Sequence, residues 1–331
     1  MKLKKNIEKT KKEKKFKLFD LNRDGKGVYE VETRKPTLKF FFVLLKRKFT
    51  QLLQLNLLML FQVVPILAIL AIVLFGAKTS NITDVSYVPL YGISKIVDSP
   101  ALFSGVDLVG SQMEVPLFTP LMTVGIIALV LFLAVTFGWQ NTGAAYVLRG
   151  LFRGDAVFVF SDYFYAIKKN LKQAFFLGLI DFICSAVLIV DLIFFFSSSS
   201  GLGTDIMLGV IVAVAIVYIF MRFYIYQLLI TFELKNIKIL KNALIFSTLG
   251  ILRNLMALIG FIVLLAIHIL LIMWLLPMGI SIPLIIPFIY IMAIVGFIAT
   301  YAAYPVIDKY MIAPYDNKGS EDAEDTDLIE E

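Results

Sequence analysis

The stretch LMALIGFIVLLAIHILLIMWLLP, residues 255–277, decides the fold of this chain. It contains no aspartate, glutamate, lysine or arginine, and His268 is its one histidine. A helix rises about 1.5 Å per residue, so the stretch would be about 34 Å long, slightly more than the hydrocarbon thickness of a bilayer. It therefore predicts a transmembrane helix.

Five further apolar runs lie along the chain, at residues 51–76, 119–141, 173–197, 205–232 and 280–303. The 331 residues are 59% hydrophobic and 17% charged. A soluble domain is nearer about one half apolar and one quarter charged. We therefore predict an all-α, polytopic membrane protein with six transmembrane helices arranged as three hairpins.

The basic residues are concentrated in segments that would lie on one side of the membrane. Of 31 lysines and arginines, 17 lie in residues 1–50, and most others follow the second, fourth and sixth runs. Connections rich in lysine and arginine stay on the cytoplasmic side. The sequence therefore predicts a multi-pass protein of the plasma membrane with both termini in the cytoplasm.

Three regions follow from this pattern. Residues 1–36 form a lysine-rich cytoplasmic tail and turn, 37–314 the six-helix membrane domain, and 315–331 an acidic cytoplasmic tail. Residues 77–118 are expected to form a folded extracytoplasmic cap. The lysine-rich tail is either a solvated segment or an anchor to anionic lipids. Few aromatic residues lie among its lysines, so we expect no nucleic-acid partner.

One segment of the N-terminal tail, DLNRDGKGVYEV (20–31), partly matches a calcium-binding loop. Asp20, Asn22, Asp24 and Gly25 fit the first half of an EF-hand. The twelfth position, which needs a bidentate glutamate, is Val31. We therefore predict a turn and no metal site, because Asp, Asn and Gly favour turns for local backbone reasons.

The first, third and fifth predicted spans each begin after a basic, partly apolar segment, here called a lead-in. The lead-ins lie in TLKFFFVLLKRKFT (37–50), YAIKKNLKQAFFLGLI (165–180) and LGILRNLMALIGFIVL (249–264). Such segments are typical of interfacial helices. The residues that match between copies are Arg47, Lys48, Lys169, Asn170, Arg253 and Asn254. The copies indicate either a threefold repeat or the basic residues that topology alone requires where a helix leaves the cytoplasm.

Two charged residues inside the third and fourth runs are expected to pair. Asp181 would lie about 13 Å above the inner end of its helix and Arg222 about 16 Å above the inner end of the next. Tyr218 and Tyr226 lie four residues on either side of Arg222 and would share its face. The predicted ion pair is either a structural clamp or a substrate or proton site.

Other polar residues in the spans have less defined roles. Asp191 is expected near the outer boundary, solvated or bonded to the cap. His268 is expected to form a hydrogen bond between helices or to relay protons. The uncharged polar residues expected to bond across helices are Asn56, Gln62, Gln140 and Asn141.

The sequence carries no recognisable catalytic arrangement. It has one histidine and one cysteine, which cannot make a Cys/His metal cluster, and it lacks the common hydrolase, zinc-protease and phosphate-loop motifs. Asp181 and Asp191 would be about 15 Å apart on one helix, too far to share a proton. We therefore expect no enzymatic activity and no cofactor.

Four segments resemble the YesL-like family, a bacterial membrane protein family defined as a domain of unknown function. They are LLKRKFTQLLQLNLLMLFQVVP (44–65), TFGWQNTGAAYVLRGLFRGDAVFVFSDYFYAIKKNLKQAFFLGLIDF (136–182), KILKNALIFSTLGILRNLMALIG (238–260) and YAAYPVIDKYMIAP (301–314). The resemblance implies a multi-span protein of Gram-positive bacteria, encoded near carbohydrate ABC-transporter and two-component genes. It carries over no catalytic residue.

Three functions remain open at this point. The first is a non-enzymatic accessory of a carbohydrate ABC-type transporter, with the lead-ins as docking surfaces. The second is a stand-alone permease whose path is lined by Asp181 and Arg222. The third is a membrane sensor that partners a sensor kinase and reads an outside ligand through the cap. No coupling loop of the ABC-permease type occurs in 149–172 or 233–254, so the chain does not resemble an importer subunit itself.

Overall fold

The computed structural model describes residues 36–80, 114–198 and 201–314, all of which belong to one compact unit. In chain order the elements are α1 (Leu38–Phe75), β1 (Lys78–Ser80), β2 (Glu114–Pro116), α4 (Pro120–Arg153), α5 (Val159–Lys169), α6 (Leu171–Ser197), α7 (Leu202–Thr231), α8 (Asn236–Leu249), α9 (Ile251–Leu275), η1 (Leu276–Met278), η2 (Ile282–Leu284), α10 (Ile286–Ile307) and the π-helical turn η3 (Asp308–Ile312).

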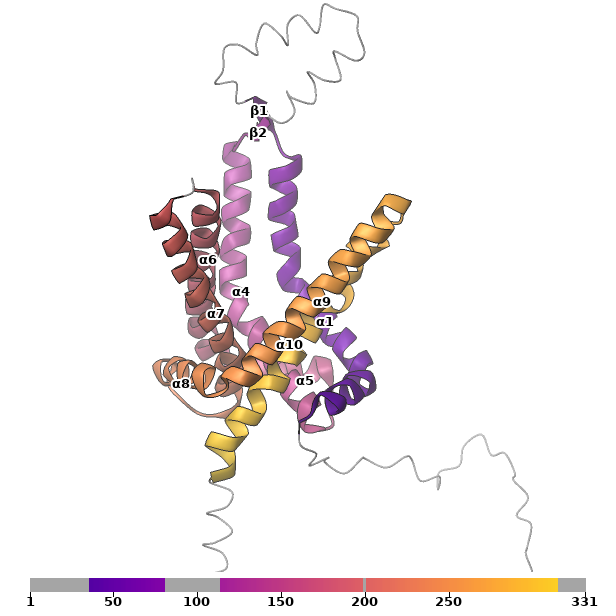
Figure 1. Cartoon of the computed structure of the whole chain (residues 1–331), viewed down its shortest axis with the longest axis vertical. Helices are drawn as coiled ribbons and strands as arrows, with labels where there is room; N and C mark the ends of the chain where they lie inside the picture. The colour runs from indigo at the N-terminus through magenta and orange to yellow at the C-terminus, as the bar shows by residue number, and fades with distance from the viewer. Residues whose placement is uncertain (1–35, 81–113, 199–200, 315–331) are drawn as a thin grey trace, which may run out of the picture. The chain divides into compact units, whose positions relative to one another are not determined.

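Six helices, α1, α4, α6, α7, α9 and α10, are long and apolar enough to cross a membrane. Consecutive members pack as pairs, α1 with α4, α6 with α7 and α9 with α10. The predicted all-α class with three hairpins is therefore confirmed (Figure 1). The sheet within the described residues is a two-stranded antiparallel ribbon, β1 with β2, in which Thr79 pairs with Val115.

The helices of the first hairpin begin and end at residues suited to those positions. Thr37 and Thr119 are N-caps whose hydroxyls accept hydrogen bonds from backbone amides, and Pro120 follows at the first helical position of α4. Gly154 ends α4 in the left-handed conformation, with φ of +82°, which glycine adopts without steric cost. As a result α4 extends twelve residues past the predicted end at 141, to Arg153.

The core lies in one half of the bundle, the half beside the short helices α5 and α8 (Figure 1). Apart from His268 of α9, the buried residues of α1, α6 and α9 lie mainly in their N-terminal parts, and those of α4, α7 and α10 in their C-terminal parts. Because the hairpins are antiparallel, these parts are at the same end, here called the basic end. The other halves expose apolar side chains, as expected for surfaces that face lipid.

The three lead-ins do not share one structure. Residues 37–50 do not form a separate interfacial helix, because nothing interrupts α1 between Leu38 and Phe75. The second and third lead-ins each contain a helix break, at Asn170 and Gly250, where φ/ψ are −113/18° and −94/15°. The break separates a short helix, α5 or α8, from the span α6 or α9, and most of each lead-in belongs to that span. The weaker first copy has no such break.

The matching asparagines of the second and third lead-ins are not at equivalent positions. Asn170 is the break itself, whereas Asn254 lies four residues after the break at Gly250. Both side-chain amides nevertheless donate to carbonyls of the preceding short helix, Asn170 to Ala166 and Asn254 to Ser247, at 3.0 Å each. In both cases the asparagine side chain adds a hydrogen bond to a carbonyl near the end of the preceding helix.

Two glycines allow α4 and α6 to cross at backbone contact. A Cβ added to Gly138 would collide with the carbonyl oxygen of Ala174 and would lie 2.7 Å from the Cα of Gly178. A Cβ added to Gly178 would collide with the Cα and N of Gly138. Small residues at helix crossings are typical of membrane proteins, where close packing replaces the hydrophobic effect between helices.

Asn56 connects the first helix to the last. Its amide nitrogen donates to the carbonyl of Phe288 at 2.6 Å, and its oxygen accepts from the backbone amide of Ala293 at 3.0 Å. The side chain is fully buried. The prediction that Asn56 bonds across helices is therefore confirmed.

Replacing Asn56 with leucine is expected to lower the free energy of unfolding by about 1–3 kcal/mol, because two backbone groups of α10, one buried and one partly buried, lose their hydrogen bonds to Asn56. Gln54→Leu, two residues away on an exposed part of α1, is the matched control and should change stability little. Denaturant titration of both variants in detergent micelles measures the difference. Equal stability of the two would show that the Asn56 bonds contribute nothing.

Several predicted features lie outside the described residues. These are the lysine-rich tail with the segment 20–31, most of the cap between β1 and β2, and the acidic tail. The ribbon β1–β2 marks where the 77–118 segment leaves and rejoins the first hairpin.

Candidate functional site

The intramembrane charges predicted to pair do so across the second hairpin. Arg222 Nε lies 3.0 Å from Asp181 Oδ1 and donates to Oδ2 at 3.2 Å. Tyr218 donates its hydroxyl to Oδ1 at 2.6 Å, and Tyr226 donates to Oδ2 at 2.7 Å. Asp181 is 2% exposed, so its carboxylate is buried with three side-chain donors. Antiparallel packing of α6 on α7 brings these positions to the same depth.

Arg222 is less enclosed than its partner. Its side chain is 34% exposed, and its guanidinium lies over the ring of Phe137, 5.3 Å from the centroid. Phe137 packs edge-on against Phe182 of α6. The arginine therefore joins α7 to α4 as well as to α6, through a cation–π contact.

A small cavity of about 210 Å³ lies beside this cluster, between α1, α4, α7, α9 and α10. Arg222, Tyr226 and Gln227 line it from α7, and Thr300 lines it from α10. Gln227 donates to the Thr300 hydroxyl at 2.9 Å, and its buried side-chain oxygen has no partner among the described residues. The cavity thus offers a cation, a phenol and a free acceptor inside the bundle.

The remaining predicted polar residues do not join this cluster. Asp191 is partly exposed, and it forms no hydrogen bond or ion pair with any described residue. Both nitrogens of His268 are buried without a partner in the described chain, so the expected interhelical bond is wrong. Gln140 likewise has no partner in that part of the chain, and Asn141 bonds Phe137 of its own helix. None of these four residues therefore forms an interhelical hydrogen bond within the described chain.

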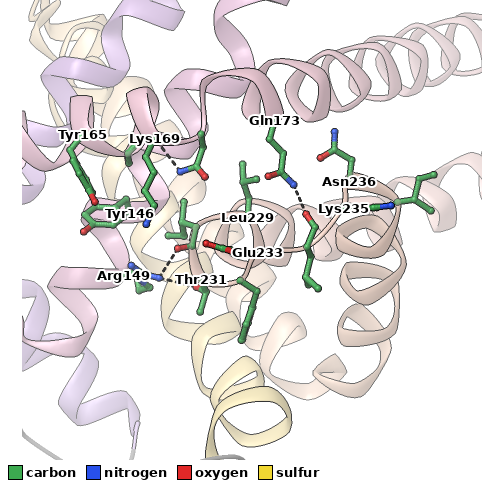
Figure 2. A pocket seen from close by; sticks show the side chains of 16 residues that line it. Tyr146, Arg149, Tyr165, Lys169, Gln173, Leu229, Thr231, Glu233, Lys235 and Asn236 are labelled. Carbon is green, nitrogen blue, oxygen red and sulfur yellow. Dashed lines mark hydrogen bonds between the residues drawn. The ribbon is translucent and has the colours of Figure 1, made fainter.

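A larger cavity of about 920 Å³ lies at the basic end, here called the basic cavity. It is enclosed by the end of α4, by the α5–α6 junction, and by the end of α7 with its connection to α8 (Figure 2). Its charged lining residues are Arg149, Lys169, Glu233 and Lys235. The second lead-in supplies Lys169 and Asn170, which the sequence singled out, and Figure 2 shows Lys169 beside Tyr146 and Arg149.

Arg149 is held rigidly at one side of the basic cavity. Its Nη1 donates to the carbonyl of Ile230 and to the hydroxyl of Thr231, both at 3.0 Å. Its guanidinium lies 5.1 Å from the centroid of the Tyr146 ring. Tyr146 in turn packs edge-on against Tyr165 of α5, with ring centroids 5.9 Å apart. Across the cavity, Gln173 of α6 bonds the carbonyl of Leu234.

The sequence did not identify the basic cavity. It placed Arg149 in a connection, where an arginine would count only toward the charge of a loop, because the second run was expected to end at 141. The useful signal is the spacing of Tyr146 and Arg149, three residues apart and thus on one helix face. The partners of Arg149, Ile230 and Thr231, are about 80 residues away and could not be inferred from the sequence.

No protein-family model, curated protein or solved structure matches this chain. The six apolar helices identify a multi-pass membrane protein by their length and composition. The resemblance to the YesL-like family therefore rests on the quoted segments alone.

Proposed function

We propose that this chain is a YesL-like, non-enzymatic accessory of a carbohydrate ABC-type transporter. It would lie in the plasma membrane of a Gram-positive bacterium, with the basic end and both termini in the cytoplasm. The observation that carries the proposal is the surface of α5 and α8, two short helices at the basic end that expose apolar side chains beside lysines. Such a surface suits a membrane-embedded partner that is apolar in one part and charged in another.

The helix α5 illustrates this design. Its inner face is buried through Val159, Tyr163 and Ala166, and burial raises the pKa of the Tyr163 hydroxyl. Its outer face exposes Phe160 and Phe164, at 48% and 50%. Exposed aromatic side chains of this kind are common anchors in interfaces between proteins.

The helix α8 repeats the pattern. Ile239 and Ala243 are fully buried, whereas Ile237 and Leu244 are exposed at 81% and 47%. Lys238 is exposed on the same helix. Both short helices therefore dock on the bundle with one face and leave the other available to a partner.

Co-purification tests the accessory role. The chain, tagged at its C-terminus, is extracted from its native host in mild detergent, and retained proteins are identified by mass spectrometry. We expect an ABC permease with its ATPase or binding protein. Phe160→Ser/Phe164→Ser should reduce the retained transporter by about tenfold.

The matched control is Phe194→Ser/Phe196→Ser on α6, which makes the same change at exposed positions of 62% and 81% away from the basic end. It should retain the transporter. Recovery of a sensor kinase would instead favour a regulatory role. Recovery of the chain alone would contradict the accessory proposal.

A stand-alone permease is the second candidate, favoured by the cavity of about 210 Å³ beside Arg222 and Tyr226. A transport path through a membrane protein is lined by polar groups that face water or substrate. Solute uptake by liposomes carrying only this chain, and its loss in Gln227→Leu, would favour this candidate over the accessory role. Absence of uptake with every solute of a carbohydrate panel would count against it.

A further inference from the structure

We propose that the basic cavity binds the phosphate group of an anionic ligand, either a soluble phosphate ester or a phospholipid head group. The proposal is independent of the accessory role, because it rests only on the chemistry of the cavity. Its volume of about 920 Å³ is ample for a phosphate with an attached polyol. Four separate features of the lining favour a phosphate.

The first feature is Arg149, which is pre-positioned and has unused donors. One of its nitrogens, Nη1, is engaged by Ile230 and Thr231, both neutral acceptors. Among the described residues it forms no ion pair with a carboxylate, and its Nη2 and Nε have no hydrogen-bond acceptor there. A guanidinium presents its nitrogens in a planar fork that matches the oxygens of a phosphate.

The second feature is the charge of the opposite walls. Lys169 comes from the end of α5 and Lys235 from the connection before α8. Glu233 is the one acidic residue in the described lining, so three cations and one anion leave a net charge of +2. Neither lysine forms an ion pair with a carboxylate in the described part of the chain. This balance attracts an anion and disfavours a cation.

The third feature is the position of two helix N-termini. The helices α6 and α8 both begin at the cavity, where Asn170 and Gln173 of one and Asn236 of the other line it. Neither N-cap residue satisfies the first amides with its side chain. Helix N-termini carry a positive partial charge and free N–H groups, which together favour phosphate.

The fourth feature is an aromatic wall next to the cations. Tyr146 and Tyr165 pack edge-on beside Arg149 (Figure 2). Tyrosine rings pack against the apolar face of a polyol or glyceryl group, and their hydroxyls can bond its oxygens. The cavity therefore holds a phosphate at its charged walls and the uncharged remainder of the ligand at Tyr146 and Tyr165.

Two probes distinguish the two sources of phosphate. The full chain is placed in nanodiscs of uncharged phosphatidylcholine, and binding of glycerol 3-phosphate is measured by calorimetry, with glycerol as the uncharged counterpart. In the second arm, phosphatidylglycerol bound to the chain in mixed-lipid nanodiscs is counted by native mass spectrometry. Saturable binding of the ester assigns a soluble ligand, and retention of phosphatidylglycerol alone assigns a lipid.

Matched lysine variants connect binding to the cavity. Lys169→Gln and Lys235→Gln should each weaken binding of the effective probe by about tenfold, since each removes a charge-assisted hydrogen bond. Lys168→Gln and Lys238→Gln change neighbouring exposed lysines that do not line the cavity and should bind normally. The side chains of these four exposed lysines form no hydrogen bond or ion pair with the described residues, whereas Arg149 donates to the carbonyl of Ile230. Their replacement should therefore leave the fold intact.

Two results would overturn the proposal. The first is that neither glycerol 3-phosphate nor phosphatidylglycerol binds to the correctly folded chain. The second is that the Lys168 and Lys238 variants weaken binding as much as the Lys169 and Lys235 variants, which would show general attraction to a basic surface.

Discussion

Asp181→Asn is expected to lower the free energy of unfolding by about 3–5 kcal/mol, because it leaves the Arg222 guanidinium in the bundle without its anion. Asp181 is 2% exposed and accepts hydrogen bonds from Arg222, Tyr218 and Tyr226. An asparagine keeps the size of the side chain but places either an uncharged oxygen or an N–H group toward the arginine. Denaturant titration in detergent micelles measures the loss.

The double variant Asp181→Asn/Arg222→Met separates a clamp from a transport site. With both charges removed, the asparagine oxygen accepts from one tyrosine and its amide donates to the other, so much of the lost stability should return. Asp191→Asn is the control, since it makes the same change on the same helix at a residue with no polar partner among the described residues. If the double variant is no more stable than Asp181→Asn, the charge pair is not the cause.

The expected recovery also bears on function. A carboxylate that already accepts from three side chains is poorly placed to bind a substrate or carry a proton, because each new contact must displace an existing one. The geometry therefore favours a clamp at Asp181 and leaves Arg222, which faces the cavity of about 210 Å³, as the more accessible member of the pair.

Gly178→Ala is expected to separate α4 from α6 and to lower the free energy of unfolding by about 1–3 kcal/mol or more. The added methyl group would overlap the Cα and N of Gly138, which are backbone atoms and cannot rotate away. Gly138→Ala should have a similar effect, because its methyl group would meet the carbonyl of Ala174. The two helices could remain packed only by shifting along their whole contact.

The chain offers matched controls for this prediction. Gly125 on α4 and Gly209 on α7 also lie within helices, and a Cβ added to either has nothing within 4 Å. Both alanine variants should be neutral or stabilising by about 0.5–1 kcal/mol, since alanine favours a helix more than glycine does. If Gly178→Ala proved as stable as Gly209→Ala, the close crossing at Gly138 would be wrong.

The charge pattern and the apolar runs were enough to predict the six helices and the three hairpins. They were also enough for the pair Asp181–Arg222, because consecutive antiparallel helices fix the relative depth of their residues. The same reasoning failed for the ends of α1 and α4. Both helices extend beyond the predicted apolar runs: α1 begins at Leu38, and α4 continues through Gly143 and Gly150 and ends only where Gly154 is left-handed.

The lead-in comparison shows a second limit. The match of Lys169-Asn170 with Arg253-Asn254 led us to expect similar lead-ins, and both matched segments contain a helix break. It did not indicate that one asparagine is the junction and the other follows it by four residues, beyond Gly250. Similar residues at the two segments mark a similar role at the end of a short helix. The backbone geometry decides at which residue the helix breaks.

The sequence by itself determined the membrane class, the hairpin order and the paired charges of α6 and α7, because these depend on length, charge and depth along single helices. Only the tertiary structure decided that Gly138 meets Gly178, that Asn56 joins α1 to α10 and that Arg149 encloses a basic cavity with Thr231. The reason is physical. In a soluble protein the buried face of a helix is marked by apolar residues, whereas a helix in lipid is apolar on every side. Its neighbours are chosen by close packing and by isolated polar contacts, which leave no periodic pattern in the sequence.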